Sequence, residues 1–336
     1  MMTTHQTFQL AANHPGGLLP NLLRELLPEQ SWSQVKRLIA SRRVQINGNL
    51  VVDEGRRVGS GDVIRINAQP LPAPVTAKQV RLVHVDEHLV VIDKPPGVTT
   101  LRHAVEKEWS HARKQRQATL DELVEELLTS PQELPRGTRQ RRLQKMQAKQ
   151  VRAVHRLDRD TSGLMVFART VPAEVELIRQ FKKHTVERAY LAIAQGTVAA
   201  QTIETMLVRD RGDGLRGSFW GESDRVSSDA ERAVTHVRPL EELAGYTVVE
   251  CRLETGRTHQ IRIHLAERGH MLCGEKTYVR ALGGPTLEDS SGAARQALHA
   301  AVLGFIHPAT GEQVQFVSPL PSDMLRLLQR LRAYGE

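Results

Sequence analysis

A proline-rich segment near residue 70 sets the first limit on how this chain can fold. Three prolines lie within the six residues 69–74. Proline has no backbone N–H and a fixed φ, so this segment cannot continue a helix or a sheet and is typical of a linker. A length of 336 residues also favours about two domains. We therefore predict an N-terminal extension at 1–15, a small domain at 16–68, a linker at 69–79 and a large domain at 80–336.

The small domain is predicted to combine two short helices with a hairpin-rich sheet. Leucines recur at helical spacing up to Pro28, and Ser31 or Ser33 can cap a second helix. After that helix, short β-branched stretches alternate with turns, the clearest at Asn47-Gly48. The expected helices cover 18–27 and 34–40, and the expected strands cover 44–46, 51–52 and 63–66.

The large domain is predicted to be rich in β-strands. Short runs of apolar and β-branched residues recur along it and end at turn residues. A few longer amphipathic stretches have helical periodicity. The expected strands cover 80–85, 89–92, 164–168, 189–194, 246–253 and 313–317, and the expected helices cover 119–128, 172–183, 258–268 and 322–333.

The charge of the chain is unevenly distributed. The sequence holds 46 Lys and Arg against 38 Asp and Glu, a net charge of +8 with a pI near 9.8. Residues 1–80 have a net charge of +4, 81–100 of −1, 101–152 of +5 and 153–336 of zero. A basic surplus favours a polyanionic partner, most simply a nucleic acid. Because only 4% of the residues are aromatic, a long base-stacking surface is not expected.

Composition also argues against several other classes of protein. No run approaches the roughly 20 apolar residues of a membrane span, and the N-terminus does not resemble a secretory signal. Cys251 and Cys273 are too few for a disulfide framework and indicate a reducing, cytoplasmic setting. We expect a monomer with no membrane partner.

A basic cluster lies in the second expected helix and in the turn after it. Its members are Lys36, Arg37, Arg42 and Arg43. Taken alone, four such charges are typical of a solvated helix face. The run 31–48, followed by 58–64, resembles the RNA-binding domain of the S-four class of ribosomal proteins. The resemblance implies that the cluster binds RNA phosphates.

The most informative motif is the run His155-Arg-Leu-Asp-Arg-Asp-Thr-Ser-Gly-Leu164. It places the carboxylate of Asp158 between two arginines, ahead of a Thr-Ser-Gly turn that leads into an expected strand. Neighbouring positive charges favour the ionised carboxylate that a nucleophile or a charge stabiliser needs. Without further context, a salt-bridged structural aspartate is the more common explanation of such a run.

This run and the blocks around it resemble the RluA-type pseudouridine synthases, whose signature is His-Arg-Leu-Asp-x-x-Thr-Ser-Gly. The resemblance implies an α+β fold with a mixed, mainly antiparallel, bisected sheet. It further implies isomerisation of uridine in RNA to pseudouridine, without a metal or an organic cofactor. The other matching blocks, in order, are 92–97, 187–192, 255–264, 297–300, 305–312 and 319–324.

The resemblance also implies roles for individual residues. Asp158 falls on the catalytic aspartate, Tyr190 on the active-site tyrosine and Arg262 on the basic partner of the aspartate. We expect Tyr190 to pack on the uracil face and Arg262 to pair bidentately with Asp158. Arg156 is expected to fill the stack from which the target base is flipped. Whether Asp158 attacks C6 of uracil or C1′ of ribose stays open. Supporting roles fall to His155, Thr161, Gly163, His259 and Gln260.

Other classes of protein fit the sequence less well or remain as alternatives. His259, His264, His270 and Cys273 lie close in sequence, but their spacing does not fit two ligands on one helix face, so no metal site is expected. A glycosidase would need a second catalytic carboxylate, and none is evident. A transfer-RNA pseudouridine synthase and a non-catalytic RNA-binding or ribosome-assembly protein remain. Family members with an S-four-type domain act more often on large-subunit ribosomal RNA, so ribosomal RNA is the favoured partner.

Two segments depart from the family pattern. Residues 101–150 form an insertion whose basic end, 136–152, holds seven Lys or Arg and no acidic residue. We predict that this end grips RNA, with a solvated loop as the alternative. In the run 274–279, Glu275 and Val279 replace the Asp and the second Gly of Gly-Asp-x-x-Tyr-Gly, which is expected to alter the local loop but not the chemistry. The RNA-gripping side chains are expected to include Arg139, Arg141 and Arg142.

Overall fold

The computed structural model divides into two compact units. Unit 1 consists of residues 1–76 and 102–119, and unit 2 of residues 77–101 and 120–336. The structure describes residues 6–11, 14–47, 49–59, 61–71, 73–102, 106, 108, 114, 117–129, 150–219, 230–281 and 284–333.

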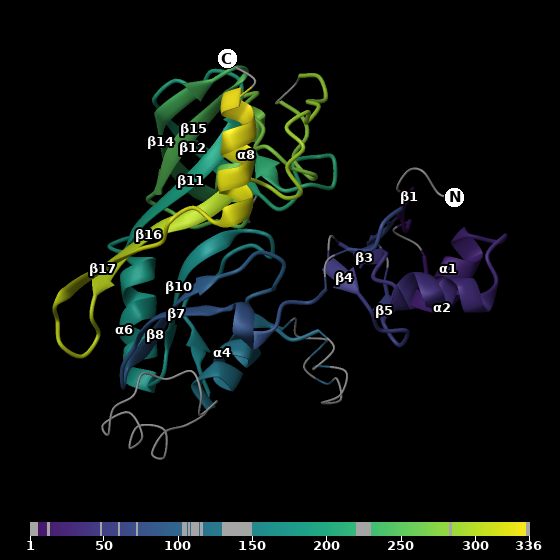
Figure 1. Cartoon of the computed structure of the whole chain (residues 1–336), viewed down its shortest axis with the longest axis horizontal. Coiled ribbons are helices and arrows are strands. Elements are labelled where there is room, and N and C mark those ends of the chain that lie inside the picture. The colour runs from purple at the N-terminus through teal and green to yellow at the C-terminus, as the bar shows by residue number, and fades with distance from the viewer. Residues whose placement is uncertain are drawn as a thin grey trace. The chain divides into compact units, whose positions relative to one another are not determined.

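Unit 1 contains a four-stranded antiparallel sheet in the order β1-β6-β3-β4, a short pair of β2 with β5, and two helices (Figure 1). Both predicted helices and the hairpin are confirmed. Because β1 pairs with β6, the sheet already begins within the predicted N-terminal extension. The elements are β1 Gln6–Gln9, β2 Gly17–Leu18, α1 Leu19–Leu26, α2 Trp32–Ala40, β3 Val44–Ile46, β4 Asn49–Val51, β5 Arg57–Val58 and β6 Val63–Ile66.

Local sequence explains where α2 begins and which face it exposes. The Ser31 hydroxyl accepts a hydrogen bond from the backbone N–H of Gln34 (3.3 Å), and the Gln34 side chain accepts one from the backbone N–H of Ser31 (2.6 Å). This capping box satisfies two N–H groups that a helix start leaves without partners. The helix buries Val35 and Ile39 against the leucines of α1, so its basic positions face solvent.

Unit 2 is built on one 11-stranded sheet in the order β13-β12-β14-β15-β11-β16-β10-β8-β7, with β17 beside β16 and β9 beside β10 (Figure 1). Among the described strands, β10 and β16 are parallel and the other pairs antiparallel. This sheet confirms the predicted α+β class. The strands are β7 Arg81–Val85, β8 Leu89–Lys94, β9 Arg152–Ala153, β10 Ser162–Ala168, β11 Glu187–Gln195, β12 Gln201–Val208, β13 Gly217–Ser218, β14 Glu231–Leu243, β15 Tyr246–Leu253, β16 Leu298–Ile306 and β17 Gln313–Val317.

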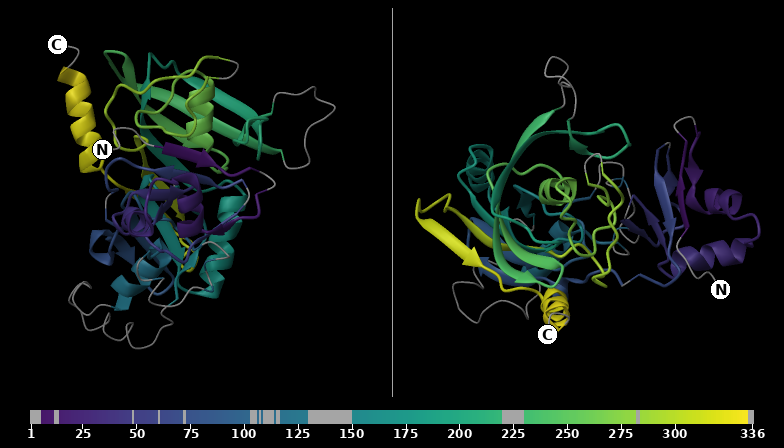
Figure 2. Two further views of the ribbon diagram at one scale, coloured as in Figure 1. Left: turned by 90° about the vertical axis from the view of Figure 1, so that its right-hand side faces the viewer. Right: turned by 90° about the horizontal axis from the view of Figure 1, so that it is seen from above.

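Helices cover the sheet of unit 2 and fill its concave side. Apolar residues of α6 pack against β10, and the leucines of α8 pack against Ile193 and Val248. Every residue of α7 is buried, and the right-hand view of Figure 2 shows this helix enclosed by the curved strands. In the described part of the chain, no helix is both long and apolar enough to cross a membrane. The helices are the short 3-10 helix η1 Ala77–Gln79, α4 Leu120–Thr129, α6 Val171–Lys182, α7 Gln260–Glu267 and α8 Ser322–Ala333.

Five strands of unit 2 were not predicted from the sequence: the two-residue strands β9 and β13, and the longer strands β12, β14 and β16. β12 is mostly polar in its first half, charged residues recur along β14, and Pro239 coincides with a shift of register in β14. β16 is an apolar run that pairs with the following strand β17 and with β10 and β11, which lie more than 100 residues earlier in the chain. Such strands are stabilised by non-local pairing, for which a local pattern gives little signal.

Candidate active site

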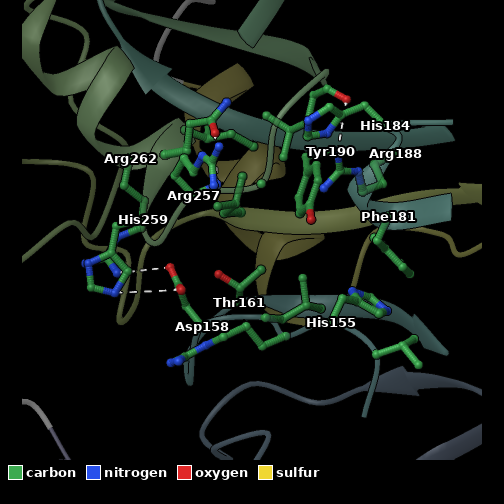
Figure 3. Close-up of a pocket in the computed structure, with 18 of the residues that line it drawn as sticks. His155, Asp158, Thr161, Phe181, His184, Arg188, Tyr190, Arg257, His259 and Arg262 are labelled. Carbon is green, nitrogen blue, oxygen red and sulfur yellow. Dashed lines mark hydrogen bonds and ion pairs between the residues drawn. The ribbon is translucent and has the colours of Figure 1, made fainter. Parts of the chain in front are cut away.

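A single pocket in unit 2 gathers most of the site residues expected from the sequence. It has a volume of about 510 Å³ and opens beside the loop between β9 and β10, which carries Asp158 (Figure 3). Tyr190 from β11 and Arg262 from α7 reach the same pocket. The sheet thus brings together residues that lie 104 positions apart in the sequence, Asp158 and Arg262.

The Asp158 carboxylate contacts two basic side chains. Its Oδ2 accepts a hydrogen bond from Nη1 of Arg262 at 3.2 Å, and its Oδ1 lies 3.7 Å from Nε2 of His259. The predicted bidentate pairing of Arg262 with Asp158 is therefore wrong. Instead, Nε and Nη2 of Arg262 each donate to Glu275 at 2.7 Å, so the fork of the guanidinium is already occupied.

Glu275 is a built-in anchor for Arg262. Its residue is only 4% exposed, and its carboxylate also accepts hydrogen bonds from the backbone N–H groups of residues 276–278. Burial would raise the pKa of Glu275, but these bonds and the Arg262 charge lower it overall. Burial likewise opposes the charge of Arg262, yet Glu275 raises the pKa of the guanidinium. Arg262 therefore stays charged and donates from Nη1 to Asp158.

Tyr190 lies on a buried strand with its ring in the pocket. It pairs across the sheet with Cys251 and Ala300, and the register with β16 shifts between Ala189 and Tyr190. Such an irregularity re-aims a side chain relative to its neighbours. Burial raises the pKa of Tyr190, so its hydroxyl keeps its proton at neutral pH. In Figure 3, the ring stands across the cavity from Asp158.

His259 begins α7 in the left-handed conformation, with φ of 60°. Its Nδ1 lies 2.7 Å from the hydroxyl of Tyr278, whose pKa is raised above 10 by burial. Burial also lowers the pKa of His259, although the Asp158 charge opposes this. When the imidazole is neutral and its Nδ1 accepts a hydrogen bond from the Tyr278 hydroxyl, its own hydrogen is on Nε2. This N–H faces Asp158.

Lys94 and Arg295 hold the loop that carries Asp158 by its backbone. Lys94 of β8, a fully buried residue, donates from Nζ to the carbonyl oxygens of Arg159 and Thr161, both at 2.8 Å. Arg295 donates to the carbonyl of Asp160 at 2.9 Å. Three consecutive carbonyls after Asp158 are thereby fixed from two sides. We call Lys94 and Arg295 the loop clamp.

The loop clamp is connected to the C-terminal helix. Arg295 also donates to the Ser162 hydroxyl (3.1 Å) and to both carboxylate oxygens of Asp323 in α8 (2.7 and 3.1 Å). Burial lowers the pKa of Lys94 to about 7, against the opposing charges of Asp160 and Asp158. The position of Asp158 thus depends on residues from both ends of unit 2.

The Thr-Ser-Gly turn after Asp158 is dictated by a close approach of two strands. Gly163 has a φ of 115°, and a Cβ there would overlap the backbone of Ala300. The Ser162 hydroxyl bonds Nδ1 of His299 at 3.0 Å. The Thr161 hydroxyl is buried, lines the pocket and has no hydrogen-bond partner among the described residues. It is available to a ligand.

The predicted supporting residues His155 and Gln260 hold the strands and loops that form the pocket wall. His155 accepts the backbone N–H of Val166 and stacks on Phe181, and burial with the Arg188 charge lowers the pKa of His155 to about 3. Gln260 is 3% exposed and ties the loop before α7 to β14 through four hydrogen bonds. In the residues that the structure covers, no cluster of three or more His, Cys, Asp or Glu could hold a metal ion.

The predicted RNA contacts are placed as follows. Arg156 is exposed at the rim of the pocket. In unit 1, Lys36 pairs with Glu54 at 3.1 Å, Arg37 is exposed, and Arg42 and Arg43 form the turn after α2. The prediction that residues 136–152 grip RNA falls mostly outside the described part of the chain, which begins again at residue 150. Arg139, Arg141 and Arg142 lie outside it too.

Sequence reasoning missed several residues that build the site. Lys94 stands inside the matching block 92–97, and Glu275 inside the run noted as a departure, but neither was assigned a role. Arg188, within the block 187–192, was also passed over. For Arg295 no sequence signal was recognised, because its function depends on a loop 135 residues away.

Two family models match this chain. The model for RNA pseudouridylate synthase matches residues 88–267, and the model for the S4 domain matches residues 18–64. The first match covers the Asp158 loop, Tyr190 and Arg262, and the second covers the basic cluster of unit 1.

Full-length relatives are similar over nearly the whole chain. The ribosomal large subunit pseudouridine synthase D of Neisseria meningitidis serogroup A is 35% identical over 94% of this chain and 79% of the relative. The protein of the same name from Zymomonas mobilis is 35% identical, covering 94% of both chains. An uncharacterised RNA pseudouridine synthase of Bacillus subtilis, YlyB, is 34% identical over 91% of this chain and 92% of its own.

Solved structures show the same fold at lower sequence identity. The human RNA pseudouridylate synthase domain-containing protein 4 has a TM-score of 0.52 and 22% identity, covering 75% of this chain and 93% of the human chain. The human domain-containing protein 1 has a TM-score of 0.51 and 23% identity, covering 78% and 98%.

Proposed function

The chain belongs to the RNA pseudouridylate synthase family, and from this we propose that it converts uridine to pseudouridine in large-subunit ribosomal RNA. The observation that carries the proposal is Asp158 in a pocket beside Tyr190 and a charged Arg262. The full-length relatives named for the ribosomal large subunit support ribosomal RNA over transfer RNA as the substrate. The S4 domain supports an RNA partner.

Conversion of uridine to pseudouridine needs a carboxylate in a fixed position and a pocket that holds the uracil while it turns. The N1–C1′ bond of uridine breaks, the uracil turns in place, and a C5–C1′ bond forms while C5 loses its proton and N1 gains one. Asp158 supplies the nucleophile, at C6 of uracil or at C1′ of ribose. Arg262 and His259 place positive charge and an N–H beside that carboxylate. The ring of Tyr190 supports the uracil face.

The substrate base must leave its stack to reach Asp158. Arg156, exposed at the pocket rim, is suited to occupy the vacated position. Lys36, Arg37, Arg42 and Arg43 would hold RNA phosphates away from the reaction. In this proposal the protein works in the cytoplasm as a monomer. Light scattering of the purified protein at micromolar concentration would check the oligomeric state.

Mapping of pseudouridine tests the proposal. Large-subunit ribosomal RNA from a strain that lacks this protein should miss a defined pseudouridine, and the wild-type protein should restore it in vitro. Asp158→Asn should bind the RNA with wild-type affinity and form no pseudouridine. An unchanged modification map in the deletion strain would favour a non-catalytic ribosome-assembly protein, and a change confined to transfer RNA would replace the substrate.

A further inference from the structure

We propose that the far end of the active-site pocket, around Arg188, binds a backbone phosphate next to the target uridine. This inference rests on the proposed function, because it takes the ligand to be RNA. We call Phe181, Lys182, His184 and Arg188 the phosphate lobe. All four residues line the pocket. In Figure 3, Phe181, His184 and Arg188 lie on the side of Tyr190 away from Asp158.

Arg188 is held in the pocket by hydrogen bonds to backbone carbonyls and by the ring of Phe181, whose centroid lies 5.8 Å from the guanidinium carbon. Its Nη2 donates to the carbonyl oxygen of Glu254 at 2.9 Å and lies 3.5 Å from that of Leu253. Gly256 makes room for the guanidinium, since a Cβ there would lie 2.5 Å from Nη1. The loop that carries Gly256 thereby sets the direction of the Arg188 side chain.

The hydrogen-bonding capacity of Arg188 is largely unused. Its Nε is buried without a hydrogen-bond partner, and among the described residues no carboxylate forms an ion pair with its guanidinium. By contrast, Arg262 and Arg257 in the same pocket are paired with Glu275 and Glu231. A buried cation without an anion is unfavourable. The missing partner therefore comes with the ligand.

The surroundings of Arg188 favour an anion over a neutral base. Among the residues that line the pocket, the only carboxylate is Asp158, on the other side of Tyr190. Lys182 and His184 are exposed at the mouth of the phosphate lobe and add further N–H donors. Guanidinium groups bind phosphate through two parallel hydrogen bonds, whereas a uracil carbonyl offers one neutral acceptor. A flipped uridine brings one phosphate on each side of its ribose into this region.

The test measures how salt weakens binding of a single-stranded RNA. The probe is a fluorescein-labelled nonamer of uridine, titrated with the full-length protein by fluorescence anisotropy at several salt concentrations. Each phosphate contact contributes about 0.7 to the slope of log Kd against log salt for single strands. Arg188→Met should lower that slope by about 0.7 and weaken binding about tenfold at low salt, the loss expected for one charged hydrogen bond. Arg188→Lys should retain most of the slope.

A matched control removes the same charge elsewhere. Arg238 lies on β14, is exposed and pairs with Glu250, so Arg238→Met should leave the slope at the wild-type value. If Arg188→Met does not fold, as judged by circular dichroism, Lys182→Met on the exposed end of α6 decides instead and should also lower the slope.

The outcomes separate this proposal from the proposed function. A lowered slope supports the phosphate lobe even if ribosomal RNA gains no pseudouridine, which would overturn only the activity. An unchanged slope overturns the phosphate lobe. If Arg188→Met then also loses pseudouridine formation, Arg188 acts on the uracil or on Tyr190 rather than on a phosphate.

Discussion

Lys94→Met is a sharp test of how the catalytic loop is held in place. Methionine has nearly the length of lysine but neither its charge nor its N–H groups. The change removes hydrogen bonds to the carbonyl oxygens of Arg159 and Thr161 and a longer one to that of Pro95 (3.2 Å). A buried carbonyl that loses its partner costs roughly 1–3 kcal/mol. The Thr161 carbonyl loses the Lys94 bond, whereas the Arg159 carbonyl keeps a bond from the backbone N–H of Gly97 at 2.9 Å. Because methionine also removes the cost of burying an ammonium group, we expect the free energy of unfolding to fall by about 3 kcal/mol.

Catalysis should suffer more than RNA binding. Asp158 directly precedes the first clamped carbonyl, so its carboxylate loses a fixed position when Lys94 is replaced. A displacement of about 1 Å at a reacting group costs on the order of 100-fold in rate. We therefore expect kcat for pseudouridine formation to fall by about 100-fold. The Kd for RNA should stay close to the wild-type value, because Lys94 is fully buried and has no surface to offer a bound RNA.

Two measurements and one control variant check this reasoning. Urea unfolding followed by far-UV circular dichroism gives the stability, and turnover on a ribosomal RNA transcript gives kcat. Lys78→Met removes the same charge from an exposed position in unit 2 and should change neither. A wild-type kcat in Lys94→Met would refute the positioning argument. A loss of stability without a loss of kcat would restrict Lys94 to folding.

Three further predictions follow from the same site. Gly163→Ala should lower the unfolding free energy by more than about 4 kcal/mol because its Cβ meets the backbone of Ala300, so a melting temperature near the wild-type value would contradict the strand contact. Burial lowers the pKa of His264 from its ordinary value of 6.5 to about 4. Between these pH values the imidazole is protonated in the unfolded chain and neutral in the folded protein. Stability should therefore fall as pH drops from 6.5 to 4, by at most about 1.4 kcal/mol per pH unit for this group, and urea unfolding of His264→Gln should show a shallower fall. Glu275→Gln should release Nε and Nη2 of Arg262 to bind Asp158, which should lower kcat at least about tenfold while RNA affinity is retained. Glu275→Asp should keep most of the activity. Equal kcat in both variants would argue against Glu275 as the anchor of Arg262.

The elements that could be predicted from the sequence are those with local signals. The cap at Ser31 and the turn at Asn47 mark the small unit, and the helical periodicity of 322–333 matches α8 residue for residue. β14 gave no such signal, because its charged residues pair with those of neighbouring strands, as Arg238 does with Glu250. Its pattern reflects its neighbours rather than its own local preference.

The reactive residues of the candidate site could be predicted from the sequence, but the residues that hold them in position could not. Asp158, Tyr190 and Arg262 could be placed through a family motif, and the structure brings them to one pocket. The bidentate partner of Arg262 could not be identified, because only the fold shows that Glu275 reaches its fork. Lys94 and Arg295 act on carbonyls 65 and 135 residues away, and a carbonyl has no signature in the sequence.

The bond between Arg295 and Asp323 also bears on when the enzyme becomes active during its own synthesis. The chain leaves the ribosome from its N-terminus, so the loop of Asp158 emerges long before β16 and α8. Until residue 323 has emerged, Arg295 has no carboxylate to orient it and the loop lacks one of its two anchors. In a nascent chain shorter than 323 residues, the loop that carries Asp158 is therefore held less firmly than in the complete fold.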